Sequence, residues 1–427
     1  MARLELINLT PHRSIVSEGH VRWDAVAHGR VIRGLPQLFW ANSSPWREAN
    51  LWLMERACNQ GVDLKTVQAK ATCLHAYANW LEASGNAWWD FPSRKEDRCL
   101  VRYRGALVQA REKSELAPST VTQRMRVIIG FYRWLRVTGL LSPDCPMWLE
   151  RTVGIHLTNS FGLERTLSVT TTDLSIPNRS RPGERLEDGL LPLSAADRNR
   201  ILNFARDQAS EELFLLLMSG FFTGMRLQTL ADLKIRTLTN AIPDPSDSNL
   251  YRLAVGPGAS PSVATKFGVS GQVWITKDLL DELLRYSHSS RRLKREVKAS
   301  SDCKDLVFLT RFGNSYAQRG SDKSVAINVE MHKFRKVALA HGIQTMREFR
   351  FHQTRCTFAT ELARLAIAAG GGIHAVAIVK DALLHKHEST SLKYIKFVEK
   401  TPIKEALANN FTKAFLGIIS GKQLQNV

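Results

Sequence analysis

The residues of this chain whose types and spacing could do chemistry concentrate between His352 and Tyr394. Segment 352–360 reads HQTRCTFAT, and segment 383–395 reads LLHKHESTSLKYI. In the first segment, His352 and Arg355 are three residues apart, so a helix would place both on one face. In the second, His385 precedes Tyr394 by nine residues. Cationic donors followed by a phenol are suited to nucleophilic attack on a phosphate.

Two arginines lie in apolar sequence, where an unpaired charge is costly. Arg226 occurs in FFTGMRLQTLADL, and Arg355 begins an apolar helix. A buried guanidinium needs a partner. For Arg226 the nearest acid on the local helix is Asp232, so a buried ion pair is one interpretation. The other is that both arginines converge on one phosphate, because guanidinium groups bind phosphate through two parallel hydrogen bonds and keep their charge.

Tyr394 and Lys266 have ordinary and catalytic interpretations. A tyrosine is usually a half-buried packing residue. Its reference pKa of about 10 means that a nucleophilic phenol needs a base or nearby positive charge, which His352, Arg226 and Arg355 could supply. Lys266 lies between two β-rich runs. It is either a solvated surface lysine or, carried into a groove by a hairpin, an acid that protonates a leaving alkoxide.

The remaining histidines and the cysteines do not suggest a metal site. His341, His374 and His387 have no comparable context, and no histidine has a cysteine or carboxylate partner at zinc-ligand spacing. The six cysteines are scattered without a CxxC pair, so we interpret them as reduced thiols. We therefore expect neither a disulfide framework nor a cofactor.

Composition points to a polyanionic partner. The chain has 427 residues, which favours two or three domains, and a net charge of +19. Nucleic acid is the commonest partner for such a charge, and a membrane surface is the rival interpretation. No apolar run approaches the ~20 residues that a spanning helix needs. The N-terminus lacks the pattern of a secretion signal, so a cytoplasmic protein is expected.

Helical patterns dominate the part of the chain that precedes these residues. Segments within 46–150 predict a four-helix bundle, with starts near Ser44-Pro45 and Pro118 and stops near Gly85 and Gly139. Its arginines are either a solvated surface or contacts to phosphates. The candidates for DNA binding are Arg102, Arg104, Arg124, Arg126 and Arg133.

The other segments complete a mainly α protein with a small antiparallel sheet. Residues 1–45 are of uncertain role, either short strands or an arm packed on the next part of the chain. Residues 151–190, rich in Ser, Thr, Pro and Gly, predict a linker. Residues 191–427 predict a second domain, opened by Ser194 as a helix cap. Within it, NLYRLAV and GQVWIT predict the sheet, KDLLDELLRYSHSSRRLKREVK one helix, and the segment after Tyr394 an amphipathic tail.

Four segments in order resemble those of the tyrosine recombinases, also called the phage integrase family. TGMRLQTLADL resembles the first arginine box, TKFGVSGQVWIT the β-hairpin lysine segment, HQTRCTFAT the His-x-x-Arg box, and LLHKHESTSLKYI the box joining histidine to tyrosine. The 46–150 module resembles the family's core-binding domain. The resemblance implies the catalytic set Arg226, Lys266, His352, Arg355, His385 and Tyr394.

Three positions depart from the family's pattern. The acid that often follows the first arginine by three residues is Thr229 here, which leaves the support of Arg226 open. The glycine usual before the second histidine is Leu384, and the histidine common after the second arginine is Cys356. These two concern packing around the site.

The resemblance implies a DNA cleavage and rejoining enzyme. Tyr394 would attack a phosphodiester and form a 3′-phosphotyrosyl link, with Arg226, Arg355 and His385 holding the transition-state charge. His352 would assist proton transfer and Lys266 would protonate the 5′-oxygen. No metal or nucleotide would be needed. The tail would dock on a neighbouring protomer, which implies a tetramer on two DNA sites, serving a mobile element.

Two other functions remain open on the sequence. A type IB topoisomerase-like nickase would use the same chemistry without strand exchange. A non-catalytic architectural DNA-binding protein would lack a catalytic residue, whereas all six are present here.

Overall fold

The computed structural model describes residues 1–17, 20–26, 31–59, 62–158, 164–178, 186–319 and 321–402. The chain divides into two compact units, Met1–Pro182 and Gly183–Val427. The prediction of a mainly α fold with small antiparallel sheets is confirmed. No helix in the described ranges is both long enough and apolar enough to cross a bilayer.

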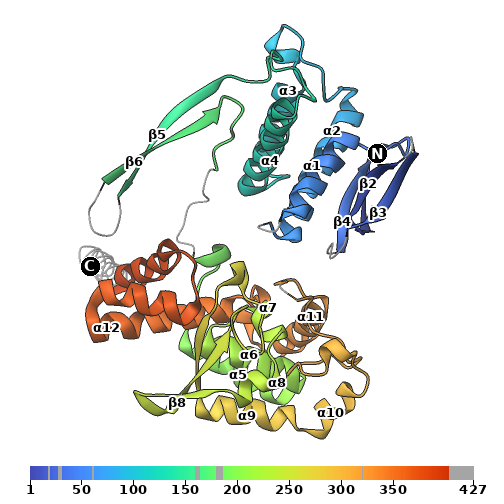
Figure 1. Cartoon of the computed structure of the whole chain (residues 1–427). Coiled ribbons are helices and arrows are strands. Elements are labelled where there is room, and N and C mark those ends of the chain that lie inside the picture. The colour runs from blue at the N-terminus through green and yellow to red at the C-terminus, as the bar shows by residue number, and fades with distance from the viewer. Residues whose placement is uncertain are drawn as a thin grey trace, which may run out of the picture. The chain divides into compact units, whose positions relative to one another are not determined.

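Four helices, α1 (Arg47–Cys58), α2 (Leu64–Ser84), α3 (Cys99–Glu112) and α4 (Pro118–Val137), form the body of the first unit (Figure 1). Local signals set their limits. Gly85 adopts the left-handed conformation (φ 65°) that ends α2, and Pro118 occupies the first turn of α4. Large aromatic side chains fill the core between them: Trp46, Trp52, Tyr77, Phe131 and Tyr132.

Residues 1–45 contain strands, and two of them, β1 and β4, pack on the helices. β1 (Arg3–Leu9) pairs antiparallel with β4 (Ile32–Phe39), whereas β2 (His12–Ser17) and β3 (His20–Ala25) form a separate hairpin. Leu35 and Leu38 of β4 are buried. The buried side-chain amide of Asn50 in α1 bonds both the N–H and the C=O of Leu38, at 2.7 and 3.0 Å. The first unit therefore includes these strands.

A two-stranded ribbon occupies much of the predicted linker. β5 (Glu150–Thr158) pairs antiparallel with β6 (Glu164–Thr172) (Figure 1). The sequence predicted a linker here and did not indicate these strands. Threonine is common in loops, but it is also β-branched and favoured in strands, so its frequency does not distinguish a linker from a ribbon. The boundary between the two units, Pro182/Gly183, falls later in the same segment.

The second unit begins with the capped helix that the sequence predicts. The Ser194 hydroxyl accepts a hydrogen bond from the Asp197 N–H at 3.0 Å and starts α5 (Ala195–Gln208). Buried α6 (Glu211–Thr223) follows, then the short helices α7 (Leu227–Ala231) and α8 (Ile235–Thr239). Ser324 caps α11 (Val325–Ala340) in the same way.

The sheet of the second unit has the antiparallel order β7-β8-β9; the two strands β8 and β9 were predicted, and β7 was not. Its strands are β7 (Ile242–Asp244), β8 (Asp247–Val255) and β9 (Gly271–Thr276). β9 lies against both α6 and α12 (Gln353–Leu383). The start of β9 lies against the end of α12, since a Cβ on Gly271 would come within 2.4 Å of the Leu384 side chain. Lys266, in the connection from β8 to β9, lines the same pocket as Arg355.

One helix boundary differs from the prediction. The single helix expected over 277–298 is divided into α9 (Lys277–Ser287) and α10 (Ser290–Glu296), because the Ser289 hydroxyl caps a new helix at the Arg292 N–H. The segment 353–383, labelled α12, consists of two helices joined at Gly371 (φ 78°). A further helix covers 388–402. From residue 403 on, the predicted oligomerisation helix lies outside the described residues.

Candidate active site

A tight turn after α6 positions Arg226. Gly224 ends the helix with φ 66°, and a Cβ there would come within 2.5 Å of the Phe358 ring and 2.6 Å of Leu383. Only glycine meets both the backbone conformation and the close approach. Two residues later Arg226 precedes the first turn of α7, with 8% of its surface exposed. The apolar sequence around it thus buries the guanidinium, as expected.

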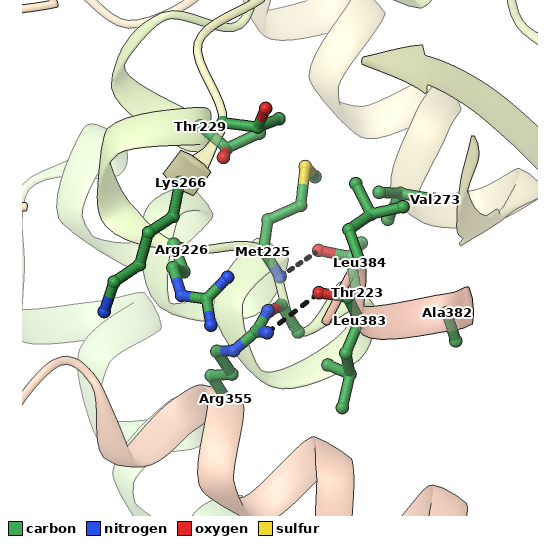
Figure 2. Close-up of a pocket in the computed structure, with 12 residues that line it drawn as sticks. Thr223, Met225, Arg226, Thr229, Lys266, Val273, Arg355, Ala382, Leu383 and Leu384 are labelled. Atoms are coloured by element: carbon green, nitrogen blue, oxygen red, sulfur yellow. Dashed lines mark hydrogen bonds between the residues drawn. The ribbon is translucent and has the colours of Figure 1, made fainter. Parts of the chain in front are cut away.

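Arg355 connects three separate segments. It lies in the first turn of α12 and is 3% exposed. Its Nη1 donates to the carbonyl of Gly224 at 2.6 Å, and its Nη2 to the carbonyl of Leu383 at 2.8 Å. Figure 2 shows the Arg355 guanidinium next to that of Arg226. Arg355 therefore joins the end of α6 to both ends of α12, and its guanidinium group lies beside that of Arg226.

His385 and Tyr394 follow α12 and pack together. Leu384 ends the helix in the left-handed conformation (φ 52°) that the family's glycine would adopt more readily, and His385 comes next. The buried imidazole contacts the Ser391 hydroxyl through Nδ1 at 2.8 Å. Its ring stacks on the Tyr394 ring, with 6.0 Å between centroids. Tyr394, in the helix over 388–402, is fully buried.

The carboxylate of Glu187 lies at the centre of these four side chains. Its Oε1 forms a short ion pair with Arg226, and its Oε2 accepts from Arg355 Nε at 3.2 Å. The same Oε2 lies 3.5 Å from His385 Nε2 and 3.4 Å from the Tyr394 hydroxyl. Glu187 belongs to a short 3-10 turn, Glu187–Gly189, inside the segment predicted as a linker. The structure thus gathers Arg226, Arg355, His385 and Tyr394 around one anion.

The charges of this cluster are strongly coupled. Burial alone would raise the pKa of Glu187, but His385, Arg355 and Arg226 together hold it well below its usual range. Burial lowers the pKa of His385, which favours the neutral imidazole. Burial also raises the pKa of Tyr394 far above its ordinary value, and Cys356 and Glu187 raise it further. The phenol therefore stays protonated until a base removes its proton.

Lys266 lies at the edge of the cluster. It begins the turn Lys266–Gly268 between β8 and β9, and it lines a small pocket together with Arg226, Thr229 and Arg355. Its ammonium group lies 5.7 Å from the centre of the exposed Phe267 ring. In Figure 2 the Lys266 side chain runs beside Arg226, and its ammonium end lies apart from both guanidinium groups.

Asp232 bonds the segment that leads to Lys266, and its ion pair is with Arg319 instead of Arg226. Its Oδ2 accepts from the Ala264 N–H at 2.7 Å, two residues before Lys266, and from Arg319 Nε at 3.2 Å. The Arg319 Nη2 in turn donates to the Ser262 hydroxyl at 2.8 Å. The buried ion pair considered for Arg226 does form, but with Glu187.

His352 lies at the cap position that starts α12, one helical turn before Arg355, and is partly buried. The helical spacing predicted for these two residues is therefore present. In the part of the chain that the structure describes, no group of three or more His, Cys, Asp and Glu side chains is placed to hold a metal ion.

Of three comparisons with known proteins, the one with solved structures finds proteins of similar fold. No protein-family model matches the chain, and neither does any curated protein sequence. Among solved structures, the Tn1549 transposon integrase in complex with transposon right end DNA matches with a TM-score of 0.50 at 13% identity, over 84% of this chain and 98% of that one.

The chain has an integrase-like fold. A second structure of the Tn1549 integrase, with circular intermediate DNA, gives a TM-score of 0.49 at 14% identity, over 81% of this chain and 94% of that one. A lambda integrase dimer bound to a COC′ core site gives 0.45 at 13% identity, over 82% and 94%. At these identities the likeness concerns the fold, and function has to be argued from the site.

The candidate DNA-binding arginines of the first unit divide between two faces of the helices. Arg126 and Arg133 are seven residues apart on α4, which places them on one face. Arg124 faces the other way, towards Tyr103 of α3: burial raises the pKa of the Tyr103 phenol, and the charge of Arg124 is close enough to oppose that rise. The group therefore does not form one continuous stripe. The remaining two behave differently: Arg102 is exposed and bonds Asn86 at 2.6 Å, whereas Arg104 is partly buried.

Sequence reasoning missed Glu187, although a signal was present. Thr229 occupies the position where the family often has an acid, and Arg226 therefore needed an acid from elsewhere. The stretch RLEDG supplies one, but it lies 39 positions before Arg226, in sequence without periodicity. Two smaller contacts were missed as well: Ser391 on His385, and the Cys356 thiol 3.8 Å from the Tyr394 hydroxyl.

Proposed function

We propose that this chain is a site-specific DNA recombinase of the integrase type, which cleaves and rejoins DNA through a 3′-phosphotyrosyl intermediate. The observation that carries the proposal is the convergence of the Tyr394 hydroxyl, Arg226 and Arg355 on one anion, the Glu187 carboxylate. Two guanidinium groups beside a phenol match a phosphodiester and its nucleophile. The integrase-like fold and the net charge of +19 support a DNA substrate.

In the proposed reaction the Tyr394 oxygen attacks phosphorus, and the bond from phosphorus to the 5′-oxygen breaks. The phenol proton passes to His352, and Lys266 supplies a proton to the departing 5′-oxygen. Arg226, Arg355 and His385 hold the additional negative charge of the pentavalent transition state. Rejoining is the same step in reverse, with a 5′-hydroxyl of the exchanged strand as the nucleophile. One phosphoester replaces another, so the bond energy is conserved and no nucleotide is consumed.

The rest of the chain would bind and assemble the DNA. We assign phosphate contacts to the basic helices of the first unit, led by Arg126 and Arg133, and therefore expect affinity to fall steeply with salt. The Tn1549 integrase, which has a similar fold, is in complex with transposon end DNA. A mobile element as the natural setting, and a tetramer across two sites, are parts of the same proposal.

The test uses nicked duplexes taken from the DNA that flanks the gene. The nick releases a short fragment after cleavage, so the phosphotyrosyl adduct accumulates. The wild-type protein should give an SDS-stable protein–DNA adduct, and two intact sites should give joined products. Relaxation of supercoiled DNA without joined products would instead favour the topoisomerase-like function. Stable binding without any adduct would favour the architectural function.

Replacing Lys266 by alanine tests the proposed acid. We expect Lys266→Ala to slow cleavage about 10²-fold or more, because general acid catalysis typically contributes that much. A substrate with a 5′-bridging phosphorothiolate has a better leaving group and should restore the rate. Single-turnover adduct formation on the two substrates measures this rescue. A variant that is equally slow on both would remove Lys266 from this role.

A further inference from the structure

The Glu187 carboxylate occupies the position that the proposed reaction assigns to the DNA phosphate. Its two oxygens divide between the two arginines: Oε1 contacts Arg226, and Oε2 contacts Arg355. The non-bridging oxygens of a phosphodiester would divide in the same way. Oε2 also lies 3.4 Å from the Tyr394 hydroxyl. The carboxylate therefore stands where a phosphate would have to lie for that hydroxyl to attack its phosphorus.

Glu187 and a phosphate therefore compete for the same donors. Nη1 and Nη2 of Arg355 bond the main-chain carbonyls of Gly224 and Leu383, and its Nε bonds Glu187. The Arg226 side chain is 9% exposed and its Nη2 also bonds Glu187. A phosphate could approach these donors only after Glu187 has left.

The chain around Glu187 has a defined structure that holds the carboxylate in place. We name residues 186–193 the Glu187 segment. Leu186 is buried in the apolar cluster that contains Cys356 and Tyr394. The segment turns back on itself at Gly189 (φ 75°), where the Leu186 N–H bonds the Leu190 carbonyl at 3.1 Å.

Two contacts with α12 secure the other end of the segment. The Leu193 N–H donates to the Thr357 hydroxyl at 3.0 Å, and the Gln353 side chain donates to the Leu191 carbonyl at 3.2 Å. Glu187 is thus inserted by an anchored turn rather than by a long side chain reaching in from the surface.

We propose that the Glu187 segment is an autoinhibitory plug, whose carboxylate keeps the site closed until a DNA phosphate displaces it. The inference rests on the proposed function. The exchange replaces one singly charged anion by another, so the buried guanidinium groups have a partner before and after it.

The first test compares rates of adduct formation under single-turnover conditions. Glu187→Gln keeps the shape of the side chain and removes its charge, so the guanidinium groups lose their tightly held anion. We expect about a tenfold faster adduct on nicked flanking DNA, because the apparent rate is reduced by the fraction of molecules that are plugged. Glu282→Gln, on the surface of α9, removes one charge elsewhere and should leave the rate unchanged.

The second test detects displacement without chemistry. Amide hydrogen exchange is followed in the Tyr394→Phe protein, free and bound to a linear duplex. Peptides covering 186–193 should exchange faster in the complex, because the bonds within the turn and to Thr357 are released. Peptides covering α9 serve as the reference.

The two tests separate the two proposals. A wild-type protein that binds duplex without forming an adduct contradicts the proposed recombinase, and the exchange experiment then decides the plug by itself. A Glu187→Gln adduct rate equal to or below that of the wild type overturns the plug, and a slower rate would make Glu187 a base or a positioning residue. Unchanged exchange over 186–193 in the DNA complex also overturns it.

Discussion

Tyr394→Phe should eliminate the covalent protein–DNA adduct while leaving DNA binding intact. The substitution removes only the hydroxyl, and loss of a covalent nucleophile costs several orders of magnitude, at least about 10³-fold. The ring keeps its packing against His385 and in the apolar cluster. The hydroxyl contacts that are lost, at 3.4 Å to Glu187 and 3.8 Å to Cys356, are long. The free energy of unfolding should therefore change by no more than about 1 kcal/mol.

The measurement is adduct yield on a nicked duplex after denaturation in SDS, alongside affinity by filter binding and Tm. Tyr251→Phe is the matched control, because Tyr251 is a partly buried tyrosine of β8 outside the cluster. It should form the adduct at the wild-type rate. An adduct that persists in Tyr394→Phe would show that another residue is the nucleophile, and the proposed mechanism would fail.

Arg226→Ala and Arg355→Ala should each bind DNA and lose about 3 kcal/mol or more of transition-state stabilisation, which is about 10²-fold or more in rate. The two variants should differ in stability. Arg355 also bonds the carbonyls of Gly224 and Leu383, so its removal leaves two buried acceptors without these donors. We expect a clear fall in Tm for Arg355→Ala and a smaller one for Arg226→Ala, whose described hydrogen bond is to Glu187 alone.

Single-turnover cleavage rates and thermal unfolding together distinguish the two effects. Arg236→Ala removes an exposed arginine on α8 and controls for the loss of one positive charge. Arg226→Lys keeps the charge but not the bidentate geometry, and should recover only part of the rate. An Arg226→Ala protein that is folded and cleaves like the wild type would contradict the assignment of this arginine to the phosphate.

Much of the candidate site could be predicted because its signals are local. The spacing of His352 and Arg355 fixes one helical face, the apolar sequence around Arg226 predicts its burial, and Ser194 caps α5 as expected. Helix limits at Gly85 and Pro118 follow from backbone preferences of single residues. Each of these inferences depends on residues within one or two turns of each other.

The tertiary structure alone decided which acid meets the arginines. Glu187 pairs with Arg355 across 168 positions of sequence, and no periodicity marks it, because a single side chain in a turn leaves no pattern. Asp232, nearer in sequence to Arg226, is taken by the Ala264 N–H and Arg319. The β5–β6 ribbon depends on pairing between two strands, which a residue-by-residue pattern along one strand does not show. Local residue types determined which groups are available for chemistry, whereas chain folding determined which anion they hold, because a buried charge takes the partner that folding brings to it.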